Sequence, residues 1–492
     1  MFGKVRWIEI ASIALVTAGC AGMRGLEPRG QPASPDELRA DKALGAAPID
    51  AAGWPGADWW TRFLDPQLNR LEEEALAASP SLDAAAARID KAVAVAGLAR
   101  AATRPGLDVL FEGTDQRYSE HDVAPSALAG RWDTASRLAT DFRYELDFWH
   151  KNRAAFEAAL SRVDAARVDA FAARLAVSVA VAHAYVELAR LHDALDVATA
   201  TLEQREHILD LTRQRVAAGL DTQVELEQAE GALPAARVAI EDLGEALDLT
   251  RHQLAALLGR GPDRGLEIER PQLGVAAETP ALPTRLPAEL LGRRPDVIAG
   301  RQRIEAAARD IVVAKADFFP RIDLLAFAGF KSIGLSNLTD AGSRVAGAGP
   351  ALHLPLFDRK AIESRLAARN ADYDAAVDEY NATLIDALRD TSDQITSVRS
   401  VARQRDDQRL ALDAARHAYD LALMRYREGL GTYLTVLSVE TEVLKQQKQS
   451  VDLRARDYAT RIGLMRALGG GFDNAAPAAR ASGTQANTRK SS

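Results

Sequence analysis

The sequence makes the same helical turn twice, in segments far apart along the chain. RVAAGLDT occupies residues 215–222 and RYREGLGT occupies residues 425–432, with Arg, Gly-Leu and Thr at the same internal spacing. Each turn lies between long stretches that lack clusters of Pro or Gly. Other equivalent positions are Pro105 and Pro320, and Leu258-Gly259 and Leu468-Gly469. The pattern indicates an internal duplication of a unit of about 210 residues.

Long helices are the main element of each repeat. Ser79-Pro80 is a typical helix start, with a capping hydroxyl followed by Pro at the first helical position. A helix of the length of 150–217 would extend about 100 Å. The two shorter helices of a repeat have nearly the same combined length, so they can stack end to end beside the long one. The predicted helices are 80–104, 150–217 and 222–258 in the first repeat, and 296–318, 359–427 and 432–468 in the second.

The packing of these helices can be read from residues 226–257. Apolar residues recur there at alternating steps of three and four, which is typical of a coiled-coil seam. Thr250 interrupts the pattern. The seam consists of Leu226, Ala229, Leu233, Ala236, Ile240, Leu243, Leu247, Leu254 and Leu257.

Each repeat also contains one segment with the period of a β-strand. In DFRYELDF (141–148) aromatic or aliphatic residues alternate with charged ones, which predicts a strand with one apolar face. The hairpins are expected at about 107–148 and 321–356, with loops at 119–130 and 334–342. The chain therefore supplies four strands, two from each repeat.

Four strands cannot close a barrel. No segment after the N-terminus is apolar over a length that favours a transmembrane helix, so a membrane crossing would require a β-barrel. Membrane barrels have at least about eight strands, so several chains must contribute. The strand count alone does not choose between two, three or four protomers.

The N-terminus has the features of an export signal. Lys4 and Arg6 precede a short apolar run, and the only cysteine, Cys20, follows Ala18-Gly19. This pattern resembles a bacterial lipoprotein signal, with Cys20 as the lipidated residue. The alternative is an ordinary signal peptide with an incidental cysteine.

The remaining boundaries follow from composition. The predicted parts are a signal peptide (1–19), an extended segment (20–58), the first repeat (59–259), a linker (260–294), the second repeat (295–470) and a disordered tail (471–492).

Composition and motifs argue against several functions. The net charge is −8, which disfavours a nucleic-acid partner. The sequence contains no HExxH, Walker or GxSxG motif, and its eight histidines are scattered. We therefore predict no enzyme activity, no catalytic residue, no metal site and no cofactor.

Several segments, taken in order, resemble the outer-membrane factors of tripartite efflux pumps, in the lipoprotein group related to TolC and OprM (the NodT type). These are DWWTRFLDPQLNRLEEEALAASPSL (58–82), LLGRRPDVIAGRQRIEAAARDIVVAKADFFPRIDL (290–324), GPALHLPLFD (349–358) and GTYLTVL (431–437). The resemblance implies a mainly α-helical homotrimer in the outer membrane of a Gram-negative cell. It implies a 12-stranded barrel in outer-membrane lipid and a coiled-coil tunnel through the periplasm. It also implies that the linker 260–294 is equatorial and, with residues 54–78 and the C-terminal end, wraps the tunnel.

The resemblance also implies function and partners. The channel would be the passive exit duct for drugs or other small molecules, working with a periplasmic adaptor and an inner-membrane transporter, of the RND type. Two alternatives stay open: the outer-membrane duct of a type I protein secretion system, and a lipid-anchored coiled-coil scaffold without a pore.

In this family the repeated turns form the periplasmic tip. The turn residues are Gly219, Asp221, Thr222, Gly429, Gly431, Thr432 and Tyr433. The family often has an acid where this chain has Gly431. Asp221 then either forms an anionic ring in the trimer or caps the helix that starts at Thr222. The motif residues Arg293, Arg294, Pro295, Asp296, Phe319 and Pro320 are expected to be structural.

Overall fold

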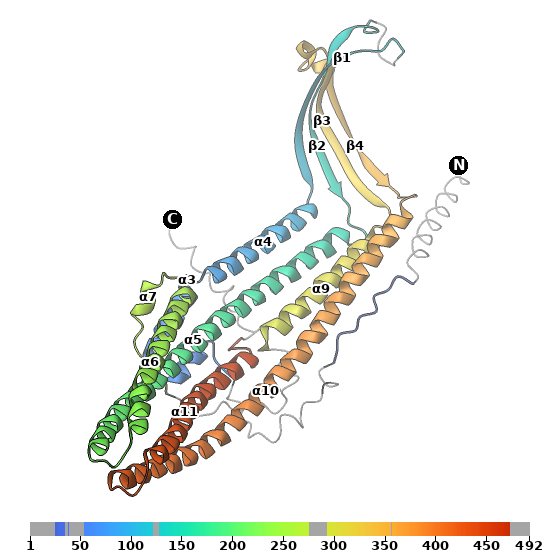
Figure 1. Ribbon diagram of the computed structural model, residues 1–492. Helices are drawn as coiled ribbons and strands as arrows, with labels where there is room; N and C mark the ends of the chain where they lie inside the picture. The colour runs from blue at the N-terminus through green and yellow to red at the C-terminus, as the bar shows by residue number, and fades with distance from the viewer. Residues whose placement is uncertain are drawn as a thin grey trace, which may run out of the picture. The chain divides into compact units, whose positions relative to one another are not determined.

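The computed structural model describes residues 25–34, 38, 54–121, 127–274, 293–355 and 357–472. The predicted signal peptide, Cys20 and the tail beyond Phe472 lie outside these residues. Long helices and one sheet make up most of the described chain (Figure 1). In order, the principal elements are α4 (Pro80–Ala102), β1 (Gly106–Arg117), β2 (Trp132–Glu145), α5 (Lys151–Ala217), α6 (Gln223–Leu257), α9 (Pro295–Ala316), β3 (Arg321–Ile333), β4 (Arg344–His353), α10 (Arg359–Arg427) and α11 (Tyr433–Ala467).

The predicted mainly helical fold with four strands is confirmed. Each long helix begins and ends within about two residues of its expected bounds, because Pro and Gly mark the ends. Shorter elements complete the described chain. They are η2 (Trp59–Phe63), α3 (Pro66–Ala78), α7 (Asp263–Leu266), η3 (Leu335–Asn337) and η4 (Ala341–Ser343). Helix α7 lies in the segment predicted as a linker.

The strand predicted over 141–148 ends earlier than expected. Strand β2 stops at Glu145, and the Asp147 carboxylate accepts hydrogen bonds from the backbone N–H groups of Asn152 and Arg153. His150 then adopts a φ of 57°, which turns the chain into α5. The alternation of apolar and charged residues therefore runs past the sheet, because Asp147 serves the helix start.

The four strands form one antiparallel sheet in the order β1-β2-β3-β4 (Figure 1). Its central ladder pairs β2 of the first repeat with β3 of the second, for example Leu138 with Phe330. Strands β1 and β4 are the edges, and neither has a second partner in the described chain. On β1 the side chains of Leu107, Val109 and Phe111 are all exposed.

The described residues fall into two compact units. One contains the sheet and is drawn from the described residues within 1–32, 88–166 and 299–381. The other contains both helical turns and is drawn from the described residues within 33–87, 167–298 and 382–492. The largest core lies in the second unit, where α3 packs against the middle of α5. Its most buried side chains include Trp59, Leu68, Leu71, Tyr185, Leu188 and Leu254.

Helix α5 bears on the prediction that no transmembrane helix follows the N-terminus. By length and composition, it is the one helix of the described chain that is long and apolar enough to cross a membrane. Of its apolar stretch of 18 residues, 56% is buried inside the protein. Val181, Tyr185 and Leu188 belong to the core of the second unit, which accounts for the apolar character of this stretch.

The repeated Leu-Gly pairs close the two repeats in the same way. Gly259 and Gly469 follow α6 and α11 with φ of 69° and 87°. A Cβ on Gly259 would lie 2.4 Å from the carbonyl oxygen of Ala78, and one on Gly469 would lie 1.9 Å from that of Arg293. Only glycine suits both the backbone conformation and the close approach.

The predicted coiled-coil seam of α6 is largely buried, with one correction. Ala229, Leu233, Ala236, Leu247 and Leu254 are buried. Thr250 was expected to interrupt the seam, but it lies within it. Its hydroxyl donates to the carbonyl oxygen of Ala246 at 2.8 Å, so the buried polar group is satisfied.

Candidate functional site: the paired helical turns

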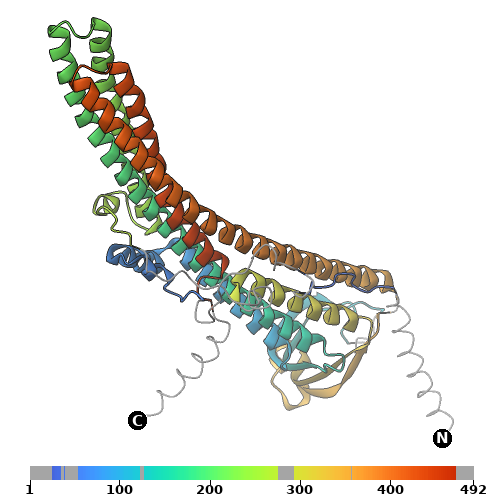
Figure 2. The same ribbon diagram turned by 90° about the horizontal axis from the view of Figure 1, so that it is seen from below.

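Both repeated turns end a long helix by the same hydrogen-bond pattern. Gly219 and Gly429 adopt φ of 72° and 74°. The next residue donates back five positions, Leu220 to Arg215 and Leu430 to Arg425, each at 2.8 Å. This is the geometry of a left-handed glycine C-cap. Figure 2 shows α5 and α6 in green beside α10 and α11 in orange and red, where both pairs end in these turns.

The helices after the turns begin at Thr222 and Thr432. The Thr222 hydroxyl accepts from the backbone N–H of Val224, and the Glu225 carboxylate accepts from the backbone N–H of Thr222. Thr432 caps α11 by accepting from the backbone N–H of Thr435. The hypothesis that Asp221 caps α6 is therefore wrong, because the adjacent threonine takes that position.

The helices α5 and α6 form one helical hairpin around the first turn, and α10 and α11 form another around the second. Asp221 joins the first turn to this second helical hairpin. Its Oδ2 accepts from Arg215 Nε at 2.9 Å and from the Tyr426 hydroxyl at 2.5 Å. Arg215 Nη1 also donates to the backbone oxygen of Tyr426 at 2.9 Å. The guanidinium lies 4.4 Å from the centroid of the Tyr426 ring. We call Arg215, Asp221 and Tyr426 the tip clasp.

The clasp keeps a charged carboxylate in a nearly dry position. The side chains of Asp221 and Arg215 are 8% and 10% exposed. Burial alone would raise the pKa of Asp221, but hydrogen bonds from Arg215 and Tyr426 outweigh it and hold that pKa below its ordinary value. Burial and the neighbouring Asp221 raise the pKa of Tyr426 to about 12. At neutral pH the pair is therefore an aspartate hydrogen-bonded to a protonated phenol.

The second turn lacks this arrangement. Gly431 occupies the position of Asp221, and Arg425 occupies that of Arg215. The Arg425 guanidinium donates to the backbone oxygen of Leu430 at 3.2 Å and is exposed. The two turns share a backbone conformation but differ in side-chain chemistry, so at the turns themselves Asp221 is the carboxylate that links the two helical hairpins.

A second polar link joins the hairpins within the same cluster of buried residues. The Glu440 carboxylate of α11 is 3% exposed and lies 3.3 Å from Nε of Arg205 on α5. Arg205 Nη1 also donates to the backbone oxygen of Ala232 on α6 at 3.1 Å. Around these groups pack Ile208, Leu209, Leu233, Tyr419, Tyr426, Tyr433 and Val436. Tyr433, predicted as a turn residue, is thus a core residue of the tip.

The motif Arg293-Arg294-Pro295-Asp296 has structural contacts. Arg294 binds Asp296 through Nη2 at 2.6 Å, Asp390 through Nη1 at 3.3 Å and the backbone oxygen of Ala467 at 3.2 Å. It therefore ties the start of α9, at Pro295, to α10 and to the end of α11. Arg293 lies over the ring of Trp54 at 4.9 Å.

The motif Phe319-Pro320 lies in the compact unit that contains the sheet. The Phe319 ring stacks on Trp149 with centroids 4.4 Å apart. The indole N–H of Trp149 donates to the backbone oxygen of Pro320 at 2.9 Å. These contacts fix the start of β3 beside the start of α5.

Arg215, Tyr426, Arg205 and Glu440 were missed as site residues. Arg215 and Tyr426 lie inside the two repeated strings, so the difference between the strings was the available signal. In the part of the chain that the structure describes, no group of three His, Cys, Asp or Glu side chains lies close enough to hold a metal ion.

The duplicated architecture matches a known family. A sequence model described as "Outer membrane efflux protein" matches residues 71–260 and 286–470. The chain belongs to this family. Each matched segment contains one strand hairpin and one of the tip turns, so the internal duplication is that of the efflux family.

Known proteins are similar in sequence to this chain along most of its length. It is 40% identical over 370 residues to the fusaric acid resistance protein FusA of Burkholderia cepacia, covering 74% of this chain and 69% of FusA. It is 29% identical over 472 residues to the multidrug resistance outer membrane protein MdtP of Escherichia coli K12, covering 94% and 96%.

A solved structure supports the same conclusion. The outer membrane protein VceC of Vibrio cholerae superposes with a TM-score of 0.81 at 38% identity, covering 85% of this chain and 100% of VceC. The efflux protein is thus an outer membrane channel that extends into the periplasm. These findings do not favour a scaffold without a pore.

Proposed function

We propose that three copies of this efflux protein assemble in the outer membrane, each contributing β1–β4 to one 12-stranded barrel. The observation that carries this proposal is that neither edge strand has a second partner among the described residues, together with the exposed Leu107, Val109 and Phe111 of β1. In lipid, unpaired backbone groups are costly, so an open sheet must close with other strands. The twelve strands of three chains exceed the minimum of about eight strands for a membrane barrel.

The duct would carry small molecules, with energy supplied by an inner-membrane transporter of the RND type and a periplasmic adaptor docked at the tip. The names of the relatives support this substrate class. They refer to fusaric acid resistance, multidrug resistance and, in Pseudomonas aeruginosa, pyoverdine export. None of these names refers to protein secretion, which makes a type I secretion duct the less favoured alternative.

The tip clasp would hold the duct closed in the absence of partners. It joins the two hairpins of one chain through a single carboxylate. A trimer would therefore contain three clasps around one mouth. Separation of the hairpins would require all three carboxylates to lose their buried partners, which is costly.

Reconstitution tests the proposal. The purified full-length protein should migrate as a trimer after cross-linking and should give small, rare conductance steps in planar bilayers. Expression in a strain that lacks its own efflux ducts should restore resistance to small hydrophobic drugs when the cognate transporter and adaptor are present. A monomer without conductance would contradict the proposal.

A further inference from the structure

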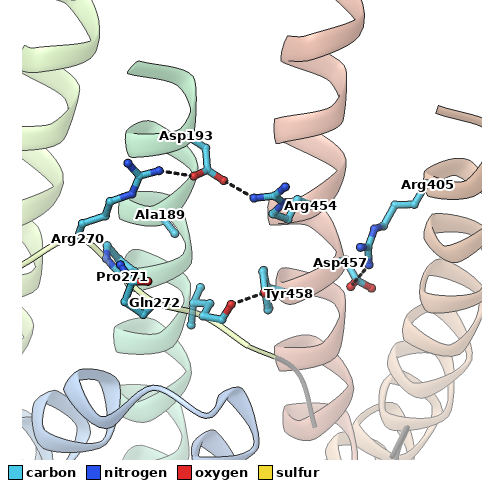
Figure 3. A pocket seen from close by; sticks show the side chains of 10 residues that line it. Ala189, Asp193, Arg270, Pro271, Gln272, Arg405, Arg454, Asp457 and Tyr458 are labelled. Carbon is cyan, nitrogen blue, oxygen red and sulfur yellow. Dashed lines mark hydrogen bonds and ion pairs between the residues drawn. The ribbon is translucent and has the colours of Figure 1, made fainter. Parts of the chain in front are cut away.

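A cavity of about 590 Å³ lies where four segments of the second unit meet (Figure 3). Helix α5 supplies Asp193, α10 supplies Arg405, and α11 supplies Arg454 and Tyr458. The segment after α7 supplies Arg270 and its neighbours. Figure 3 shows the three arginine side chains on different segments around the opening.

The acceptors in this cavity are already occupied. Asp193 accepts from Arg270 at 2.8 Å through one oxygen and from Arg454 at 3.0 Å through the other. Asp457 accepts from Arg405 at 2.6 Å and from Arg461 at 3.2 Å, again through different oxygens. Both carboxylates are thus shared between two guanidinium groups.

The donors, in contrast, are in excess. A guanidinium carries five N–H donors. Arg405 and Arg454 each use only one nitrogen within the described chain, and Arg270 uses only Nη2, toward Asp193 and Asp196. The arginines exceed the aspartates by one positive charge, the set being Arg270, Arg405, Arg454 and Arg461 with Asp193, Asp196 and Asp457. The guanidinium N–H groups that have no acceptor among the described residues are therefore cationic hydrogen-bond donors, which suit carboxylate or phosphate oxygens.

A neighbouring cavity of about 460 Å³ extends this basic surface. Arg405 and Arg454 line both cavities, and the second adds Arg409 and Arg416 together with Asp406 and Asp413 from α10, so its four arginines outnumber its two aspartates. Neither Arg409 nor Arg416 forms an ion pair with any described residue. The excess of donors continues along the groove between α10 and α11.

The size and walls of the first cavity narrow the ligand class further. A volume of about 590 Å³ falls in the range of small-molecule sites. Pro271, Leu273 and Tyr458 give it apolar wall area beside the arginines. We propose that this cavity binds a small organic anion that bears carboxylate or phosphate groups.

Such a ligand would connect elements that are far apart in sequence. It would bridge the segment 270–273, α10 and α11 through Arg270, Arg405 and Arg454. A ligand that binds only the folded state stabilises that state as its concentration exceeds its Kd. The proposed site is separate from the clasp and goes beyond the proposed export function.

Citrate is a suitable probe because it is small and carries several carboxylates. Its binding to the purified full-length protein can be measured by calorimetry and by the shift in Tm. The double variant Arg405→Gln, Arg454→Gln leaves Asp457 with Arg461 and Asp193 with Arg270, so neither carboxylate is left unpaired. Arg456→Gln is the control, because it removes one positive charge from α11, as Arg454→Gln does, at a residue that does not line either cavity.

We expect citrate to bind and to raise the Tm of the unmodified protein and of Arg456→Gln equally. The double variant should bind at least about tenfold more weakly, since two charge-assisted donors are lost. Absence of citrate binding, or equal binding by the double variant, would overturn the proposal. So would equally tight binding of inorganic phosphate, which would show recognition of charge alone. Conductance of the same preparations reports on the channel separately.

Discussion

The hydroxyl of Tyr426 lies 2.5 Å from Oδ2 of Asp221, although 205 positions separate the two residues in the chain. Tyr426 belongs to the second repeat and Asp221 to the first. The contact therefore links the two halves of the duplication at their tips. Arg215 supplies the countercharge at 2.9 Å from the same oxygen.

Replacement of Asp221 by Asn should open the tip. The amide leaves the nearly buried Arg215 without its anion, at a cost of about 2 kcal/mol, or about thirtyfold in the equilibrium between closed and open states. Open probability in planar bilayers should rise accordingly. The control is Arg425→Gln, which alters the equivalent arginine of the second turn, where no carboxylate is bound. Asp221→Asn channels that stay as closed as the control would refute the gating role.

The clasp should resist mild acid. The pKa of Asp221 is held below its ordinary value. The ionised carboxylate therefore stabilises the closed tip at any pH above the ordinary pKa of an aspartate, and this stabilisation is lost as the pH falls through the lowered pKa. Conductance should therefore stay low from pH 7 to about pH 5 and rise only below the usual range of an aspartate, near pH 4. The Asp221→Asn channel should show no such acid transition.

Replacement of Glu72 by Gln should stabilise the protein at neutral and basic pH. The carboxyl of Glu72 is fully buried, and neither oxygen has a hydrogen-bond partner among the described residues. Burial raises its pKa to about 9, with Arg174 opposing the shift. Because the folded-state pKa is raised, the unmodified protein should lose stability as pH increases from about 4.5 toward 9.

At pH 7 the expected gain for Glu72→Gln is on the order of 3 kcal/mol. It should vanish below about pH 4.5, where the carboxyl is neutral in both states. Thermal unfolding at several pH values measures both effects. Parallel stability curves for the two proteins would argue against a neutral buried carboxyl.

Alanine at Gly469 should weaken closure of the second repeat. A Cβ there would lie 1.9 Å from the carbonyl oxygen of Arg293, on a backbone with φ of 87°. We expect a loss of about 2 kcal/mol or more, measured by thermal unfolding. Gly244→Ala is the control, because a Cβ at that helical position meets nothing within 4 Å. That variant should gain up to about 1 kcal/mol, and an equal response of both variants would contradict the close approach.

Cys20 lies outside the described residues, and its lipidation stays a prediction. Labelled palmitate should be incorporated into the expressed protein and should be absent from Cys20→Ser. Ala21→Ser is the matched control and should keep the label. An unlabelled native protein would favour the ordinary signal peptide.

The long helices were predictable because their ends depend on local chemistry. Pro80, Pro295, Gly219 and Gly429 define helix starts and ends whatever packs around them. The strand of the first repeat was less predictable at its end, because Asp147 continues the alternating pattern while it serves α5.

The role of Asp221 could not be predicted from local pattern. Asp and Thr are both good capping residues, and adjacent positions 221 and 222 offer one of each. The choice depends on Arg215 and on Tyr426 from the other repeat. The contact with Tyr426 forms only when the helical hairpins α5–α6 and α10–α11 pack together, so it cannot be predicted from a single sequence.

The ladder between β2 and β3 has an evolutionary consequence. It is the only strand pairing in the described sheet that joins the two repeats, and it places one hairpin beside the next. The pairing that would close a barrel, β4 of one chain with β1 of the next, repeats that relation. With the three-chain barrel proposed above, an ancestral gene of half the length would have encoded a hexamer, and the gene fusion would have kept each strand hairpin beside the same kind of neighbour. Two separately translated halves of the present chain should then be able to rebuild the same sheet.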